Sequence, residues 1–127
     1  MMKDQLIQDI LAIPAENQNI EFKRLSVSKN EVGKIVETVV AMANTDGGVI
    51  VLGINDPEDT KLKGLDRIFG IEENLENFDA IGREIQRIIP PLAGIWPPKK
   101  AEVAEIHKTI ALLFVPKSTD HFRSIHN

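Results

Sequence analysis

The stretch from residue 28 to residue 54 constrains the fold more than any other part of this sequence. Ser28 and Glu31 have the spacing of a capping box, in which two side chains satisfy free amides at a helix start. Apolar residues then recur at helical spacing over three turns, at Val32, Ile35, Val36, Val39, Val40 and Ala43. After a glycine turn, the run 49–54 is continuously apolar and too short for a helix. The sequence therefore predicts an amphipathic helix that leads into a central strand covered on both faces.

Weaker patterns predict two elements before this unit. Residues 3–13 place four apolar side chains on one helical face, and Pro14 stops the helix. A short loop follows over residues 14–19. Residues 20–25 then alternate in polarity, which is typical of a half-buried strand.

Further elements are predicted after the central strand. Residues 61–71 contain two glycines, and we expect a short strand and a turn there. Asn74 is placed to cap a helix that runs as far as Pro90. The segments 100–106 and 109–115 are strand candidates, and the two residues between them favour a hairpin.

The resulting order, α-β-α-β-loop-α-β-β, predicts an α+β domain with a mixed β-sheet and helices on one face. A length of 127 residues suits a single domain with one core, residues 1–127. The polar C-terminal tail lacks a terminating element. We therefore expect this domain to be the N-terminal part of a longer protein.

Composition excludes several classes of protein. The chain has no cysteine, which excludes a disulfide framework and thiolate metal sites. No segment reaches the roughly 20 apolar residues of a membrane span, and the N-terminus lacks a signal peptide, so we expect a cytoplasmic protein without a membrane partner. The net charge of −4 counts against a protein that coats nucleic acid non-specifically. A nucleic-acid partner then requires a local basic patch.

Three segments together resemble a known family. They are Glu16-(four residues)-Glu21-Phe22-Lys23-Arg24, Ala43-Asn44-Thr45-Asp46-Gly47-Gly48, and a strand that ends in Gly53-Ile54-Asn55-Asp56. Gly64 and Val115-Pro116-Lys117-Ser118 extend the likeness over nearly the whole chain. The pattern resembles the Schlafen-type, Alba-like DNA-binding domain of bacterial proteins described as transcriptional regulators, some formerly described as divergent ATPases or as helicase-related. The resemblance implies an Alba-like fold without a cofactor, and nucleic acid as partner, with DNA favoured over RNA.

Basic residues in two places are candidates for contacts with backbone phosphates, which supply most non-specific affinity. The first group is Lys23, Arg24 and Lys29, beside the start of the long helix, and the second is Lys61, Lys63 and Arg67. For any one of these residues, a solvated position without a ligand is the alternative.

The turn formed by Asn44, Thr45, Gly47 and Gly48 has two interpretations. Backbone amides beside glycines can approach a phosphate. Alternatively, the turn needs glycine only for its geometry, and we favour this interpretation. A phosphate-binding loop of the nucleotide-triphosphatase type would open a helix, whereas these glycines close one, so ATP hydrolysis here is not expected.

Glu16, Glu21 and Asp56 raise a second function. Some eukaryotic Schlafen relatives cleave structured RNA with three carboxylates at matching positions. The resemblance therefore implies, as an alternative, a metal-dependent ribonuclease that uses Mg²⁺ or Mn²⁺. Convergence of the two glutamates requires a loop before Ile20, because a spacing of five puts them on opposite faces of a continuous strand. In the simpler interpretation, Glu21 pairs with a neighbouring cation and Asp56 caps a turn.

The acidic net charge leaves a third function open, a protein-interaction or dimerisation module that forms a homodimer and has no nucleic-acid role. Salt-dependent retardation of duplex DNA separates the first function from this one. Metal-dependent cleavage of RNA separates the second function from both of the others. The three histidines of the chain, His107, His121 and His126, are not spaced to form a metal site.

Overall fold

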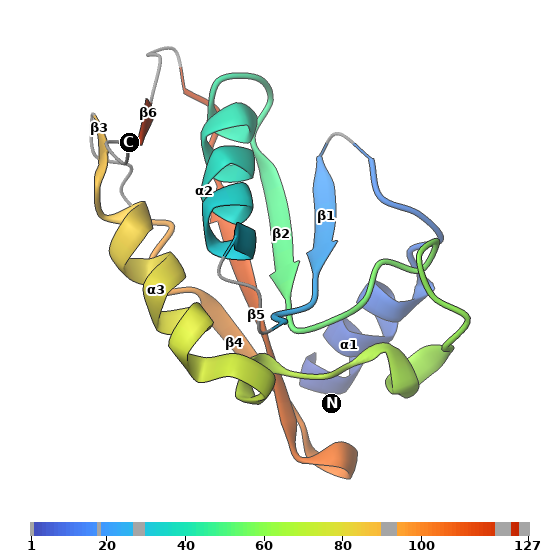
Figure 1. Ribbon diagram of the computed structural model, residues 1–127. Coiled ribbons are helices and arrows are strands. Elements are labelled where there is room, and N and C mark those ends of the chain that lie inside the picture. Colours follow the sequence, from blue (N-terminus) through green and yellow to red (C-terminus); the bar gives the residue numbers. More distant parts are fainter. Residues whose placement is uncertain (1, 18, 27–29, 90–93, 119–122, 125–127) are drawn as a thin grey trace.

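A computed structural model of the chain describes residues 2–17, 19–26, 30–89, 94–118 and 123–124 (Figure 1). The described helices are α1 (Met2–Ala12), α2 (Asn30–Ala43) and α3 (Leu75–Ile85), with short 3₁₀ turns η1 (Gly64–Arg67), η2 (Ile71–Asn74) and η3 (Ala104–Ile106). The described strands are β1 (Ile20–Lys23), β2 (Gly48–Leu52), β3 (Ile88–Ile89), β4 (Lys99–Val103), β5 (Lys108–Val115) and β6 (Arg123–Ser124).

The main sheet has four strands in the order β1-β2-β5-β4. β1 is parallel to β2, whereas β2 with β5 and β5 with β4 are antiparallel. A separate two-stranded sheet pairs β3 with β6. The predicted α+β fold with a mixed sheet is therefore confirmed, and β1 and β4 form the two edges of the main sheet.

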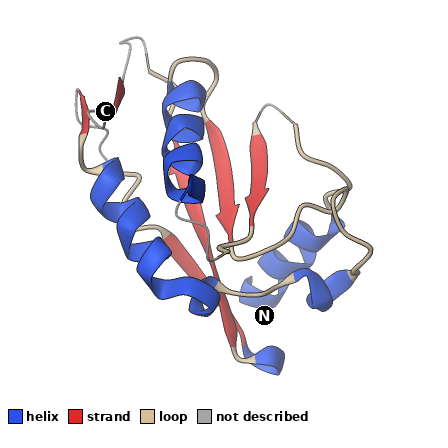
Figure 2. Ribbon diagram, in the orientation of Figure 1, coloured by secondary structure: helices blue, strands red, loops and turns tan. Residues whose placement is uncertain are grey.

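Apolar side chains fill both faces of this sheet. On one face, Ile50 and Leu113 pack with residues of α2 and α3, which lie side by side in Figures 1 and 2. On the other face, Val51 and Leu112 pack with Ile7 of α1. Helices were predicted on one face only, and this holds for α2 and α3 but not for α1. The physical reason is that β2 and β5 are apolar on both faces, so both faces need a cover.

The segment 61–71 differs from its prediction. It forms η1 and the start of η2 instead of a strand, and its pairing with the sheet is limited to an isolated bridge between Ile54 and Ile68. Gly53 holds the segment in place, because its carbonyl accepts hydrogen bonds from the amides of Phe69 and Gly70, both at 2.8 Å. The predicted strand is therefore wrong, and turns around glycines replace it.

The start of α3 agrees with its prediction, whereas the end of α3 and the connection between β4 and β5 differ from theirs. Asn74 caps α3 as predicted, since its side chain accepts a hydrogen bond from the Asn77 amide at 2.9 Å. The helix ends at Ile85, earlier than predicted, and Ile88 instead pairs with Ser124 in the small sheet. The predicted hairpin of β4 and β5 is present, but η3 and His107, at φ 54°, form its connection. The predicted cap Ser28 lies outside the described residues.

Candidate functional site

The loop before β1 turns back on itself and brings Glu16 beside the edge strand. Asn17 and Ile20 exchange two backbone hydrogen bonds of 3.2 Å, which closes the turn. The Glu16 carboxylate then accepts a hydrogen bond from the Phe22 amide at 2.7 Å. The loop that this convergence requires is therefore present, and the bond to Phe22 occupies a free amide of the sheet edge.

Glu16 meets Asp56 at this edge. Asp56 lies in the loop after β2, where its side chain also accepts a hydrogen bond from the Glu58 amide at 3.0 Å. Burial raises the pKa of Glu16, and a hydrogen bond to Asp56 together with the charges of Asp56 and Glu21 raises it further. The bond from the Phe22 amide acts in the opposite direction. The two carboxyl groups therefore share a site in which negative charge is not fully compensated.

Glu21 lies next to this pair on β1. Its carboxylate is 3.7 Å from the Lys23 ammonium, which extends from the same face of the strand. The oxygen that faces Lys23, Oε2, is buried, and this ion pair is too long to be a hydrogen bond, so Oε2 has no hydrogen-bond partner among the described residues. A buried carboxylate oxygen normally has a partner, so this oxygen could accept a bond from a ligand or coordinate a cation.

The three carboxylates offer suitable ligand atoms for a divalent cation, but they are not gathered closely around one point. Carboxylate oxygens are the ligands that Mg²⁺ and Mn²⁺ prefer. However, within the described residues no three acidic or histidine side chains are grouped closely enough to hold a metal ion. The arrangement is a close pair, Glu16 and Asp56, with Glu21 as a neighbour whose charge acts on Glu16. The donor types fit, and the uncompensated charge favours a cation there.

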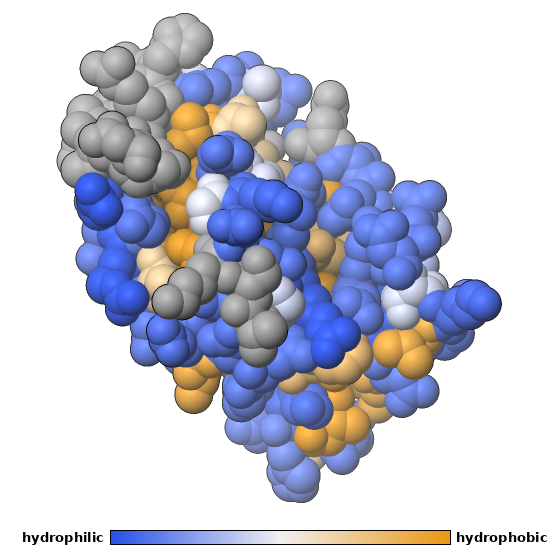
Figure 3. Space-filling view, viewed as in Figure 1, coloured by the Kyte–Doolittle hydropathy of each residue, from blue (hydrophilic) through white to orange (hydrophobic). Residues whose placement is uncertain are grey.

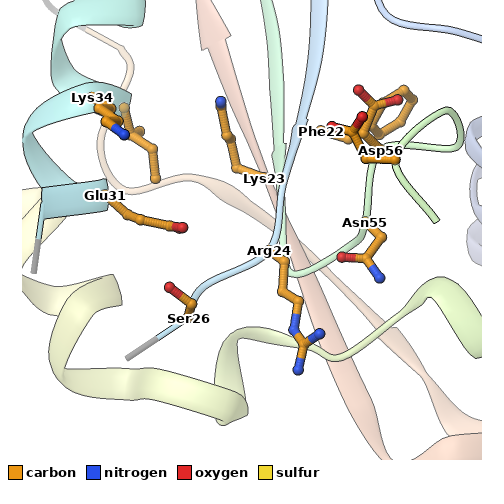
Figure 4. A pocket seen from close by; sticks show the side chains of 10 residues that line it. Phe22, Lys23, Arg24, Ser26, Glu31, Lys34, Asn55 and Asp56 are labelled. Atoms are coloured by element: carbon orange, nitrogen blue, oxygen red, sulfur yellow. The ribbon is translucent and has the colours of Figure 1, made fainter. Parts of the chain in front are cut away.

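An open cavity of about 350 Å³ lies at the end of β1 (Figure 4). Three elements contribute to its lining: β1 with the residues after it, α2, and the loop after β2. Its lining residues are Phe22, Lys23, Arg24, Ser26, Glu31, Lys34, Ile35, Asn55, Asp56 and Asp59. The face of the molecule seen in Figure 3 is mainly hydrophilic. Asp56 therefore belongs both to the carboxylate pair and to an accessible cavity.

The predicted basic group beside β1 is engaged in ion pairs. Lys23 faces Glu21, as described above. Arg24 donates from Nε to both carboxylate oxygens of Glu73, at 3.0 and 2.9 Å, and its guanidinium stacks on the Phe69 ring at 3.5 Å from the centroid. Lys29 lies outside the described residues. The charges of Lys23 and Arg24 are thus partly neutralised before any ligand binds.

The second basic group divides into exposed and buried members. Lys61 and Lys63 are exposed and form no ion pair with the described residues. Arg67 is only 4% exposed, and its guanidinium donates to the carbonyl of Asn55 at 3.0 and 3.2 Å and to that of Leu11 at 3.4 Å. Burial lowers the pKa of Arg67, although the charge of Asp56 opposes this. Arg67 is therefore not available at the surface for a phosphate.

Internal hydrogen bonds occupy the amides of the glycine turn. The amides of Thr45 and Gly47 both donate to the Met42 carbonyl, at 3.1 and 2.7 Å, and the Asn44 amide donates to Val40. Gly47 has φ 74°, and a Cβ there would lie 2.6 Å from the Val115 carbonyl oxygen. Gly48 continues into β2 and pairs with Val115. These bonds and close approaches are the requirements of a tight helix-to-strand turn.

Sequence reasoning missed two charged residues of this region. Glu73 pairs with Arg24 although 49 residues separate them, and no local pattern signals such a contact. Lys34 lines the cavity from α2. Its spacing of three residues from Glu31, on a helix already predicted, placed both side chains on one helical face and could have identified it.

A family model described as Schlafen, AlbA_2 matches residues 16–124. A solved structure of the N-terminal domain of a RecG-related protein from Nitrosomonas europaea, whose name refers to an ATP-dependent DNA helicase, is similar with a TM-score of 0.56 and 26% identity. The match covers 98% of this chain and 81% of that one.

A second solved structure, the DIP2311 protein from Corynebacterium diphtheriae, shows the same fold with a TM-score of 0.53 and 20% identity. The match covers 97% of this chain but only 24% of that protein, so this chain spans about a quarter of its length. No curated protein sequence matches this chain. Among the described helices, none combines the length and apolar character needed to cross a membrane.

Proposed function

The chain belongs to the Schlafen, AlbA_2 family, and on this premise we propose that it is the DNA-binding domain of a transcriptional regulator. The observation that carries the proposal is the pair Lys61 and Lys63, which are exposed and unpaired among the described residues. Two free ammonium groups can each neutralise a phosphate, which supplies affinity independent of base sequence. The 26% identical N-terminal domain of the RecG-related protein supports nucleic acid as the partner.

Neutralising these two lysines should weaken binding to duplex DNA. We expect the slope of log K against log salt to fall by about 0.9 for each lost phosphate contact, or roughly 1.8 for Lys61→Gln with Lys63→Gln. Fluorescence anisotropy with a labelled duplex, titrated at several salt concentrations, measures this slope. The same titration with an RNA duplex tests the expected preference for DNA.

A matched control is the double variant Lys99→Gln with Lys100→Gln. These two lysines are also exposed, but they lie on β4, at the sheet edge opposite β1. Their loss should leave the slope nearly unchanged. Equal slopes for the wild type and both double variants would contradict the proposed contacts. Absence of binding by the wild type to either nucleic acid would instead favour the protein-interaction alternative.

The carboxylate site supports a second candidate function, a metal-dependent ribonuclease. The specific observation is the contact of Glu16 with Asp56, together with the charge of Glu21, which acts on Glu16. In this candidate, Glu16 and Asp56 would bind Mg²⁺ or Mn²⁺ with Glu21 beside them, and the cation would orient water and neutralise charge on a phosphodiester. Lys23, which is close to Glu21, would stabilise the charge on the phosphate.

Metal binding can be tested without relying on activity. Mn²⁺ should raise the free energy of unfolding of the wild type, because it binds the carboxylate site only in the folded protein. The expected increase is about 2.7 kcal/mol at a hundredfold excess over Kd, and thermal unfolding measures it. Asp56→Asn should lose this effect, whereas Asp79→Asn on α3 should keep it. Cleavage of tRNA should likewise be lost in Asp56→Asn and kept in the wild type and in Asp79→Asn. An equal Mn²⁺ response of wild type and Asp56→Asn, or no response in either, would reject this candidate.

A further inference from the structure

We propose that Lys34 of α2 binds a backbone phosphate of an unpaired nucleic-acid strand in the cavity at the end of β1. This inference rests on the proposed nucleic-acid function and extends it to a residue outside both predicted basic groups. It also names the form of the ligand, which is a single strand instead of a duplex.

Three cationic side chains line the cavity, and two of them are already engaged: Lys23 with Glu21, and Arg24 with Glu73. Lys34 is exposed and forms no ion pair with the described residues. A phosphate that enters the cavity therefore meets an ammonium group that does not have to break an existing pair.

Lys34 extends from α2 on one side of β1, whereas Asp56 lies on the other side, after β2 (Figure 4). A strand that binds along this line would place a phosphate at the cation and keep the rest of its backbone near the carboxylates. Asp59 also lines the cavity, and Glu31 does so from α2. Because acidic side chains lie on both sides, a strand needs the cationic contact with Lys34 for its affinity.

Glu31 provides an internal comparison on the same helix. Its side chain extends from α2 into the same cavity, one turn before Lys34, and forms no ion pair with the described residues (Figure 4). A phosphate beside Lys34 would be repelled by Glu31. Neutralising these two residues should therefore change the affinity in opposite directions.

The cavity volume of about 350 Å³ lies at the lower end of the range of small-molecule sites, roughly 300–1,000 Å³. Such a volume accommodates one nucleotide unit, while a duplex is too wide to enter. Unpaired strands also reach concave sites because their backbone bends easily.

The test uses a labelled single-stranded oligonucleotide of thymidines and fluorescence anisotropy at several salt concentrations. Lys34→Gln should lower the salt slope by about 0.7, which corresponds to about a fivefold loss of affinity at 0.1 M salt. Lys34→Arg should restore both, and Glu31→Gln should raise the affinity. Lys99→Gln, on the opposite sheet edge, should leave both unchanged. Gln and Lys have similar helix propensities, and a thermal melt checks that each variant is folded.

The outcomes separate the two proposals. If the wild type binds neither duplex nor single strand, the proposed function fails. If the wild type binds and Lys34→Gln retains its slope and affinity, the assignment of Lys34 is overturned while the proposed function stands. AMP and inorganic phosphate should displace the strand no better than sodium chloride of equal ionic strength. Displacement by AMP at lower concentrations would overturn the assignment to a strand in favour of a free nucleotide.

Discussion

Gly47→Ala is expected to lower the free energy of unfolding by about 3 kcal/mol, from the cost of a left-handed alanine together with overpacking. Gly47 has φ 74°, a conformation that costs little only for glycine. A Cβ at this position would lie 2.6 Å from the Val115 oxygen and 2.8 Å from the Lys117 nitrogen. Both are backbone atoms, so the turn between α2 and β2 would have to distort.

Gly33→Ala is the matched control, and it should raise the free energy of unfolding instead of lowering it. Gly33 lies inside α2, where nothing is within 4 Å of an added Cβ. Alanine favours a helix interior over glycine by about 1 kcal/mol, so this variant should be more stable than the wild type. Urea unfolding followed by circular dichroism measures both changes. A Gly47→Ala variant as stable as Gly33→Ala would show that the turn does not require glycine.

Arg67→Met is also expected to lower the free energy of unfolding by about 3 kcal/mol, because it removes a buried guanidinium and its hydrogen bonds to two backbone carbonyls. The Arg67 guanidinium donates to Asn55 and Leu11 and lies 5.4 Å from the centroid of the Phe22 ring. It thereby ties the loop after β2 to the end of α1. Arg67→Lys should recover only part of the loss, since one ammonium cannot reproduce the planar fork of donors.

The same substitution should affect the carboxylate site. Asp56 directly follows Asn55, so a loosened loop would place its carboxylate less accurately beside Glu16. The Mn²⁺ response expected of the wild type should therefore weaken in Arg67→Met when measured well below its melting temperature. Arg83→Met on α3 is the control, because replacing an exposed arginine should change the free energy of unfolding by no more than about 0.5 kcal/mol. An Arg67→Met variant as stable as this control would refute the structural role.

Local patterns predicted most of the elements correctly. The α2–β2 unit depends on a helical period of apolar residues, a glycine turn and a β-branched run, all within 30 residues of one another. Asn74 likewise caps α3 through its neighbour Asn77. In each case the chemistry that decides the element lies inside the element or directly beside it.

Other features depended on partners far away in the chain. α3 ends at Ile85 because Ile88 is buried and pairs with Ser124, a residue that no local pattern connects with it. The placement of α1 on the second sheet face follows from the pairing of β2 with β5, which creates an apolar surface there. The strand expected within 61–71 was replaced by turns, since Gly53 supplies their hydrogen-bond acceptor.

The sequence by itself determined the family and the order of the main elements, and it proposed a set of carboxylates, through motifs read along a few consecutive residues. Only the tertiary structure decided which charges are free. Arg24, Lys61 and Arg67 all carry a positive charge and look alike in the sequence. In the structure, Arg24 is paired, Lys61 is exposed and Arg67 is buried. A charge interacts with whatever the fold places within a few ångströms of it, and in a compact domain those neighbours come from distant parts of the chain.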